Sequence, residues 1–299
     1  MHSKKEGHSI DTLCELFGKR RQAYYKKKKH STSIAFQSEV IIQMIAKERK
    51  LMPRLGGRKL YFKLSDKLPE ELHMGRDKFF DFLRDNNLLV RRKRYKAITT
   101  MSSHWLRKYP NLIRDFIPNG PHQLWVSDIT YVETSEGFVY LFLITDAYSR
   151  KIIGWNISDN LGADNAVVAL YMALSQLPAR VKNLIHHSDR GVQYCSSKYV
   201  GILNKHNVNI SMTEKGDPLE NAVAERVNGI LKTEWINEIK LESLNDAIVH
   251  IKQIIDIYNS ERPHCSIELL TPNQAHVENR SLKRLWKNYY KTKDQKCHI

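Results

Sequence analysis

The chain has few cysteines, no long apolar run and no apolar N-terminal segment. Its four cysteines include no C-x-x-C pair, so neither a zinc ribbon nor a disulfide framework is expected. The longest strongly apolar run covers residues 138–145, whereas a membrane helix needs ~20 apolar residues. The first residues, MHSKKEGHS, lack the apolar core of a signal peptide. We therefore expect a cytoplasmic protein with free thiols and no membrane contact.

Acidic residues are outnumbered by basic ones, and the imbalance is uneven along the chain. The 299 residues include 48 Lys and Arg against 32 Asp and Glu, a formal net charge of +16. Residues 1–120 hold 28 basic and 12 acidic residues, residues 121–280 hold 14 and 19, and residues 281–299 hold 6 and 1. A polyanion such as DNA is the expected partner. A basic arm joined to an acidic middle predicts a binding module that carries a catalytic one, located at the nucleoid.

The first 120 residues have the hydrophobic spacing of short helices. The expected helices cover residues 10–17, 40–51, 58–67 and 76–86. Gly18 is expected in the turn of a small helix-turn-helix. Two basic runs, Lys26–Lys29 and residues 90–96, follow helical hairpins. They are either solvated surfaces or phosphate contacts, and we favour contacts because basic side chains there position a protein on DNA.

From Gln123 the pattern changes to that of a mixed α/β fold. Three strands with short links, over residues 123–134, 138–149 and 151–158, predict an antiparallel meander. Further strands are expected over residues 183–187 and 208–212, and helices over 163–177, 196–206 and from about Pro218 to Trp235. This alternation predicts a sheet with helices on its faces.

Two aspartates stand where a carboxylate does not favour the fold. Asp128 lies in the middle of the first expected strand, although aspartate is depleted from strand interiors. Asp189 comes at the carboxyl end of another strand, where ligand groups collect in α/β sheets. Both positions therefore favour a functional carboxylate.

A third carboxylate, Glu225, is expected on the last of these helices. At helical spacing it shares a polar strip with Asn221, Asn228 and Lys232, opposite an apolar face. Such a strip is either a solvated surface or part of a site. Its amide-rich character favours a site.

Two aspartates on neighbouring strands and a glutamate on a packed helix can converge on a pair of Mg²⁺ ions, with Mn²⁺ as a substitute. Mg²⁺ prefers oxygen ligands, and two such ions ~3.5–4 Å apart activate an attacking oxygen and stabilise a leaving one. The implied chemistry is phosphoryl transfer on nucleic acid. The pattern alone leaves other acidic residues open as alternatives, namely Asp146, Asp159, Asp164 and Asp217.

Five strings stand out: WVSDITYVET, DAYSRKIIGW, HHSDRGVQYCS, MTEKGDPLENAVAERVNGILKTEW and YNSERPHCSIELLTPNQA. They closely resemble the integrase catalytic core of bacterial insertion-sequence transposases of the second-reading-frame (OrfB) type, which are related to retroviral integrases. The resemblance implies a ribonuclease-H-like mixed five-stranded sheet with flanking helices. In that family 35 residues separate the second and third metal-binding carboxylates, as they separate Asp189 from Glu225 here. The resemblance therefore implies that Asp128, Asp189 and Glu225 form a catalytic, metal-binding DDE triad.

The same resemblance implies cleavage at terminal inverted repeats and transfer of the ends to target DNA. It also implies a homo-oligomer on DNA and an upstream-frame (OrfA-type) protein, separate or fused by frameshifting. Lys232, seven positions after Glu225, corresponds to a DNA-contacting residue of the family. We expect further DNA contacts from Asn221, Arg190, Lys215, Arg91, Arg92, Lys93 and Arg94.

Four regions follow from these patterns. They are a basic N-terminal helical segment (1–38), a helix-turn-helix-like DNA-binding region (39–110), the catalytic core (115–277) and a basic C-terminal tail (278–299). The second region resembles the family around PRLGGRKLYFKLSDKL and FLRDNNLLVRRKRY. Retroviral integrases carry an N-terminal His-His-Cys-Cys zinc module, but only Cys14 precedes the core here, which favours the bacterial branch.

Three other features of the sequence suggest alternative functions. His186 and His187 are adjacent in a strand, so at most one can face the site; buried packing is favoured over orientation of Asp189 by His187. A tyrosine recombinase would need an arginine cluster around a nucleophilic tyrosine, and the Tyr24–Tyr25 and Tyr289–Tyr290 pairs lack one. A non-catalytic DNA-binding regulator leaves Asp128 in its strand unexplained.

Overall fold

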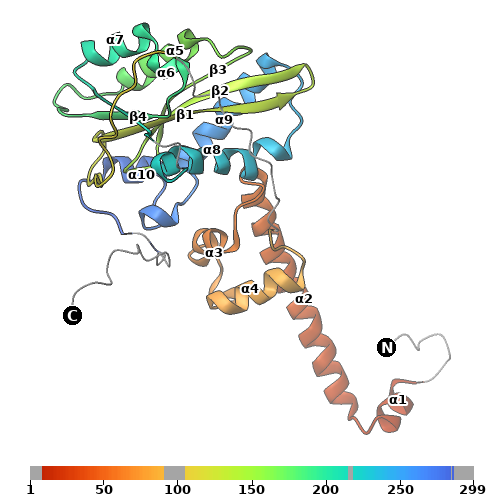
Figure 1. Cartoon of the computed structure of the whole chain (residues 1–299). Coiled ribbons are helices and arrows are strands. Elements are labelled where there is room, and N and C mark those ends of the chain that lie inside the picture. The colour runs from red at the N-terminus through yellow and green to blue at the C-terminus, as the bar shows by residue number, and fades with distance from the viewer. Residues whose placement is uncertain (1–8, 91–104, 215–217, 284, 286–299) are drawn as a thin grey trace, which may run out of the picture. The chain divides into compact units, whose positions relative to one another are not determined.

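The computed structural model describes residues 9–90, 105–214, 218–283 and 285, without the side chains of residues 27–35 and 218–219. The chain forms two compact units, which are considered separately. One comprises residues 1–50 and 60–88, and the other residues 51–59 and 89–299. Within the described residues, no helix is both long and apolar enough to span a membrane. Figure 1 shows the elements of both units.

The first unit is helical, as the sequence predicts. Its elements are α1 (Ile10–Leu16), α2 (Arg21–Leu51), α3 (Gly57–Ser65), the short 3₁₀ helix η2 (Glu70–Leu72) and α4 (Arg76–Asp85), with α2 and α3 each reaching beyond it at one end. Gly18 has a φ of 62° in the turn after α1, a conformation that glycine adopts without strain. α2 runs unbroken for 31 residues, so the expected boundary at residues 38–39 falls inside a helix.

The core of this unit is made by one face of each helix. Its fully buried side chains include Ile45 of α2, Leu60 and Leu64 of α3, and Phe79 and Leu83 of α4. In α3 and in α4 the two side chains are four residues apart, so each helix buries an apolar stripe on one face. The three helices thus stabilise one another through packing rather than through backbone hydrogen bonds alone.

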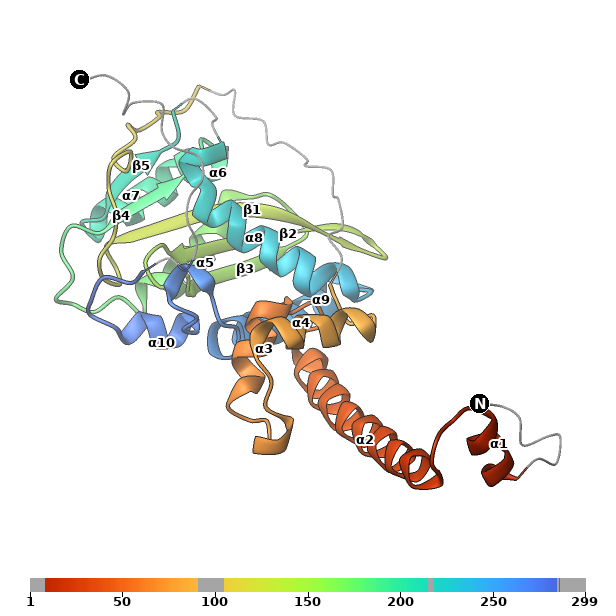
Figure 2. The same ribbon diagram turned by 90° about the horizontal axis from the view of Figure 1, so that it is seen from below.

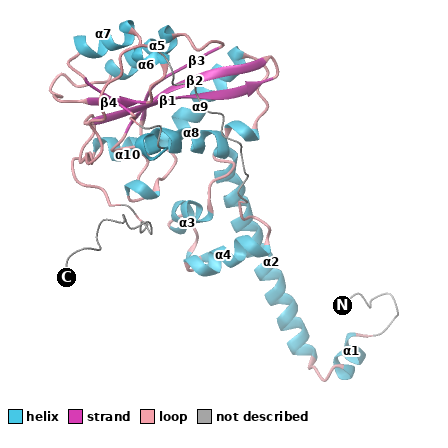
Figure 3. Ribbon diagram, in the orientation of Figure 1, coloured by secondary structure: helices cyan, strands magenta, loops and turns pink. Residues whose placement is uncertain are grey.

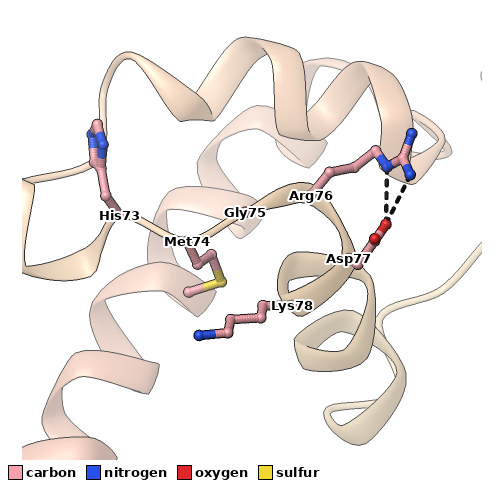
Figure 4. A pocket seen from close by; sticks show the side chains of 6 residues that line it. All are labelled: His73, Met74, Gly75, Arg76, Asp77 and Lys78. Carbon is pink, nitrogen blue, oxygen red and sulfur yellow. Dashed lines mark hydrogen bonds and ion pairs between the residues drawn. The ribbon is translucent and has the colours of Figure 1, made fainter.

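One surface hollow belongs to this first unit. It is lined by the six residues from His73 to Lys78, where η2 leads into α4. Figure 4 shows the Arg76 guanidinium turned toward the Asp77 carboxylate, an ion pair of 2.9 Å. None of these residues is a predicted site residue.

The second unit is built on a five-stranded sheet. Its strands are β1 (Leu124–Thr134), β2 (Gly137–Asp146), β3 (Ile152–Ser158), β4 (Ile185–Ser188) and β5 (Asn209–Met212), in the order β3-β2-β1-β4-β5. β1, β2 and β3 pair antiparallel, whereas β4 and β5 run parallel to β1. The predicted meander and mixed sheet are confirmed (Figure 3).

Helices cover both faces of this sheet. One face carries α5 (Ala163–Leu174), α6 (Val192–Cys195) and α7 (Ser197–Lys205), and the other carries α8 (Ala222–Glu234), α9 (Leu244–Ser260) and α10 (Pro272–Val277). The alternation of β1 separates the two cores: Trp125 belongs to the cluster with α5 and α7, and Leu124 and Val126 to the cluster with Ala224 of α8. α9 and α10 are elements that the sequence interpretation did not place.

Gly154 sets how closely α5 approaches the sheet. A Cβ atom at this position of β3 would lie 2.2 Å from the backbone oxygen of Ala169. No side chain fits there, so glycine allows the helix and strand to pack in direct contact.

α8 is anchored at its carboxyl end by a buried ion pair. The Arg262 guanidinium, 1% exposed, donates from Nε and Nη2 to both carboxylate oxygens of Glu234, at 2.8 and 2.6 Å. Trp235 Nε1 donates to the Leu51 carbonyl at 2.8 Å, and Lys59 Nζ lies 3.4 Å from Glu234 Oε1. Residues 51–59 are thereby tied to α8 within the second unit.

This ion pair yields a stability prediction. Glu234→Gln leaves the Arg262 charge buried without a carboxylate, so we expect the free energy of unfolding to fall by about 3–5 kcal/mol. The matched control is Asp256→Asn, which breaks the exposed pair with Lys252 and should cost less than about 0.5 kcal/mol. Urea denaturation of the two variants measures both values, and equal losses would contradict the assignment.

Candidate active site

Asp128, inside β1, and Asp189, just after the end of β4, lie side by side on neighbouring strands. The parallel register pairs Ser127 of β1 with Ser188 of β4, so each aspartate comes one residue after a paired position. Side chains alternate along a strand, which places both carboxylates on the same face. The sequence predicted both positions separately, and the register brings them together.

α8 lies across this same face, as Figure 2 shows. Asn221, just before the helix, donates from Nδ2 to the Ser127 carbonyl at 3.0 Å, and Asn228 donates from Nδ2 to Asp128 Oδ2 at 2.7 Å. Glu225 stands four residues after Asn221 and three before Asn228, a spacing that puts all three on one helix face. The strip that carries Glu225 is therefore turned toward Asp128.

The electrostatics of Asp128 reflect this crowding of like charges. Burial raises its pKa to about 7, and the charges of Asp189 and Glu225 add to the rise, against the hydrogen bonds from Asn228 and the Ile129 N–H. Positive charge brought near such a carboxylate favours its charged form. Asp128, Asp189 and Glu225 together thus have the electrostatic character of a cation site.

Asp189 is oriented by the turn that follows β4. Its Oδ1 accepts the Gly191 N–H at 3.0 Å. A Cβ atom on Gly191 would lie 3.0 Å from the same oxygen, so a side chain here would crowd the carboxylate. The glycine of this turn lets the backbone hold Asp189 directly.

The three carboxylates match the expected metal in ligand type. Three carboxylates supply the hard oxygen ligands that Mg²⁺ prefers, and the charges of Asp189 and Glu225 help to raise the pKa of Asp128. Among the described residues, however, no group of three or more His, Cys, Asp or Glu side chains is close enough to hold one ion. The three carboxylates fit Mg²⁺ by their chemistry, and their roles as its ligands are a proposal.

Lys232 is half-buried on the same strip as Glu225. Burial lowers the pKa of its ammonium group, and the charge of Asp128 opposes this shift. The Lys232 charge thus lies within electrostatic range of Asp128, as expected from its place on the strip with Glu225.

The other residues expected to contact DNA have mixed outcomes. Asn221 is 5% exposed and holds the start of α8 on β1, so a DNA contact from it stays a prediction. Arg190 is half-buried, and its charge helps to lower the pKa of Glu214. Outside the described residues lie Lys215, Arg91, Arg92, Lys93 and Arg94.

Asn228 is the site residue to which the sequence interpretation gave no role. Its place on the polar strip with Glu225 was evident from helical spacing, and the amide-rich character of that strip favoured a site; the structure buries its side chain. Its partner was not evident, because Asp128 lies 100 residues away in sequence. Only the packing of α8 on β1 brings the two together.

The alternative aspartates have other partners. The Asp146 carboxylate is fully buried and accepts hydrogen bonds from His122 N, Ser149 N and Ser149 Oγ at 2.7–2.9 Å. Asp164 pairs with Lys198 on the exposed surface of α5, and Asp159 accepts from Asn160 Nδ2. Asp217 lies outside the described residues.

The two histidines lie on opposite faces of β4 and are both buried, as expected. His186 shares hydrogen bonds with Ser127 Oγ and Tyr199 OH at 2.7 and 2.9 Å, and burial lowers its pKa to about 3. His187 Nδ1 is hydrogen-bonded to Ser211 Oγ at 2.8 Å, and burial lowers its pKa to about 4. Both rings are neutral at pH 7 and pack within the fold.

Comparison with known proteins places the chain in a family. Models described as "Integrase core domain" match residues 118–218 and 206–272. The chain is 34% identical to "Insertion element IS600 uncharacterized 31 kDa protein" of Shigella sonnei over 265 residues, 87% of this chain and 96% of that protein. It is 37% identical to "Transposase InsF for insertion sequence IS3A" of Escherichia coli (strain K12) over 202 residues, 67% of this chain and 69% of that protein.

A solved structure was also matched. The HTLV-2 integrase catalytic core domain in complex with magnesium aligns with a TM-score of 0.42 and 19% identity, over 52% of this chain and 97% of that one. From the relatives in sequence and the integrase core models, this chain belongs to the IS3 family of insertion-sequence transposases, whose ribonuclease-H-like core is related to that of retroviral integrases.

Proposed function

We propose that this transposase cuts and joins DNA strands at a divalent-cation site made by Asp128, Asp189 and Glu225. The observation that carries the proposal is the pairing register that sets Asp128 beside Asp189, with the Glu225 strip of α8 held over them by the Asn228–Asp128 hydrogen bond. Three elements distant in sequence thus carry carboxylates that act electrostatically on one another, since Asp189 and Glu225 both raise the pKa of Asp128. Separate structural roles for the three residues would not require this interaction.

Mg²⁺ is the proposed cation, as two ions, with Mn²⁺ as a substitute. When bound, such cations would activate the attacking oxygen and stabilise the leaving one. Asp128, Asp189 and Glu225 would hold them through carboxylate oxygens. Asn228 and the Ile129 N–H each bond one oxygen of Asp128, at 2.7 and 2.9 Å, which fixes the direction of its remaining lone pairs. Lys232 places a positive charge near a phosphate of the bound strand.

The proposed substrates are the terminal inverted repeats of the element and a target duplex. Water attacks the phosphodiester at an element end and displaces the 3′-oxygen of that end. The freed 3′-hydroxyl then attacks a target phosphate in line and displaces the target strand's own 3′-oxygen. No bond between protein and DNA forms in either step. Cutting and joining two ends requires at least two active sites, so we propose a homo-oligomer on DNA, assisted by an upstream-frame protein.

We also propose the four regions named above as the division of labour. Residues 1–38 and 39–110 bind DNA, residues 115–277 carry catalysis, and residues 278–299 form a basic tail. The basic excess of the first 120 residues, 28 against 12 acidic, supports the binding role. The 14 basic and 19 acidic residues of positions 121–280 suit a part that depends on cations to approach phosphate.

Replacing any carboxylate of the triad by its amide tests the site. Asp128→Asn, Asp189→Asn or Glu225→Gln keeps the shape but removes a charged ligand, so cleavage of a duplex from the element's flanks should fall at least about a hundredfold. DNA binding should persist. Asp164→Asn, which changes an exposed aspartate of the same core, should keep activity. Full activity in one triad variant would remove that residue from the site.

The pKa of Asp128 gives a second prediction. In metal-free protein its carboxyl should titrate near pH 7, followed by NMR of the labelled side chain. Asn228→Ala removes a hydrogen bond that lowers this pKa and should raise it, whereas Asp189→Asn removes a neighbouring charge and should lower it.

Because the pKa of Asp128 in the folded chain lies above that in the unfolded chain, this carboxyl favours folding at low pH. That contribution is lost as pH rises from about 4 to 7, and Asp128→Asn should abolish it. A pKa near 4 would contradict the site electrostatics.

The salt dependence of DNA binding tests whether the two basic runs contact phosphates. If Lys26–Lys29 and Arg91–Arg94 contact phosphates, log K should fall against log salt with a slope of about −0.9 per contact. Alanine at these positions should therefore flatten the slope, measured by fluorescence anisotropy. Lys232→Ala should instead lower the cleavage rate more than the affinity. An unchanged slope would identify the runs as solvated surface.

A further inference from the structure

The chain segment just before the core, Pro110–Arg114, runs along the outer edge of β5. Met212 N donates to the Pro110 carbonyl at 3.3 Å, and Leu112 N donates to Ser211 Oγ at 2.9 Å. The segment therefore covers the free edge of the sheet next to the end of β5. It lies where the chain leaves the sheet toward α8.

Glu214 and Glu220 attach this segment to the approach of α8. Asn111 N donates to Glu214 Oε1 at 3.2 Å, and Arg114 forms an ion pair with Glu214 Oε2. Glu220 Oε2 accepts the Glu214 N–H at 2.7 Å, while its Oε1 accepts from Asn111 Nδ2 at 3.5 Å. The Glu220 carboxylate thus joins Asn111, the end of β5 and the short helix η3 (Pro218–Asn221).

These contacts continue to the catalytic helix. Glu220 is followed by Asn221, whose side chain is bonded to β1. Asn111 Oδ1 accepts the Ile113 N–H at 2.9 Å, and Ile113 packs against the cluster that contains Ala224. Glu225 directly follows Ala224. The contacts of Asn111 therefore reach the first turn of α8 by two routes, one through Glu220 and the other through Ile113.

We propose that Asn111 and Glu220 are positioning residues for Glu225. They hold η3 and the first turn of α8 against the segment before the core, so that Glu225 stays in line with Asp128 and Asp189. The inference rests on the proposed function of the three carboxylates. Neither residue touches the reacting atoms, and their effect passes through the placement of Glu225. A displacement of about 1 Å at such a group is enough for a large loss of rate.

The principal test compares Glu220→Ala with Glu220→Gln in the full chain. Alanine removes both accepted hydrogen bonds, and we expect the single-turnover cleavage rate to fall about 10- to 100-fold, with DNA affinity and melting temperature little changed. Glutamine keeps an oxygen that accepts the Glu214 N–H and should restore most of the rate. Glu136→Ala, an exposed glutamate in the β1–β2 turn, is the matched control and should behave as wild type.

Two further readouts separate positioning from simple loss of fold. Mn²⁺ binding to the DNA-free chain, measured by calorimetry, should weaken in Glu220→Ala and recover in Glu220→Gln. In a double-mutant cycle of cleavage rates, Asn111→Ala and Glu220→Ala should be less than additive because they break one connection. The control for this cycle is Asn204→Ala, which changes an exposed asparagine of α7. Its effect on the cleavage rate should be additive with that of Glu220→Ala.

The outcomes are distinct from those that test the triad. If wild-type chain cleaves DNA and Asp128→Asn does not, but Glu220→Ala cleaves like wild type or the cycle is additive, the positioning inference is overturned. Equal losses of rate and DNA affinity would overturn it as well. If Glu220→Ala fails to fold, Asn111→Ala and Glu220→Gln carry the same comparison. Activity retained in Asp128→Asn would instead overturn the proposed triad.

Discussion

Like charges held close together on β1 and at the carboxyl end of β4 are the constraint on which the rest of the structure depends. Asp128 and Asp189 occupy neighbouring register positions, and burial with their mutual repulsion raises the pKa of Asp128 to about 7. In a medium of low dielectric this repulsion opposes folding. The fold offsets it with hydrogen bonds from Asn228 and from backbone N–H groups. Such a costly arrangement is typical of a functional site.

A catalytic role for Glu225, which is exposed, also requires that α8 hold it in a fixed position. The helix is tied to β1 through Asn221 and Asn228, and its carboxyl end is held by the buried Glu234–Arg262 pair. Contacts spread along the whole helix resist both sliding and tilting. A catalytic constellation needs this support, because its groups act only within a narrow range of positions.

Sequence patterns predicted most of the elements because their signals are local. Alternation in β1–β3 and the helical spacing of residues 163–177 each depend on neighbouring residues, and the structure has α5 at Ala163–Leu174. The long α2 was expected only in part, since its polar middle lacks an apolar stripe. α9 and α10 were not placed, although α10 has a full capping box at Thr271 and Gln274. Asp128 was selected because it is unfavourable in a strand, and the triad as a whole because the spacing resembles a family.

The sequence by itself determined which side chains are chemically out of place: a carboxylate inside a strand, a carboxylate at a strand end and an amide-rich strip on a helix. Only the tertiary structure decided which of them meet. The parallel register of β1 and β4 brings Asp128 to Asp189, and the packing of α8 brings Asn228 to Asp128 across 100 residues. The physical reason is that strand pairing and helix packing are set by contacts between distant segments, which no local pattern of residues encodes.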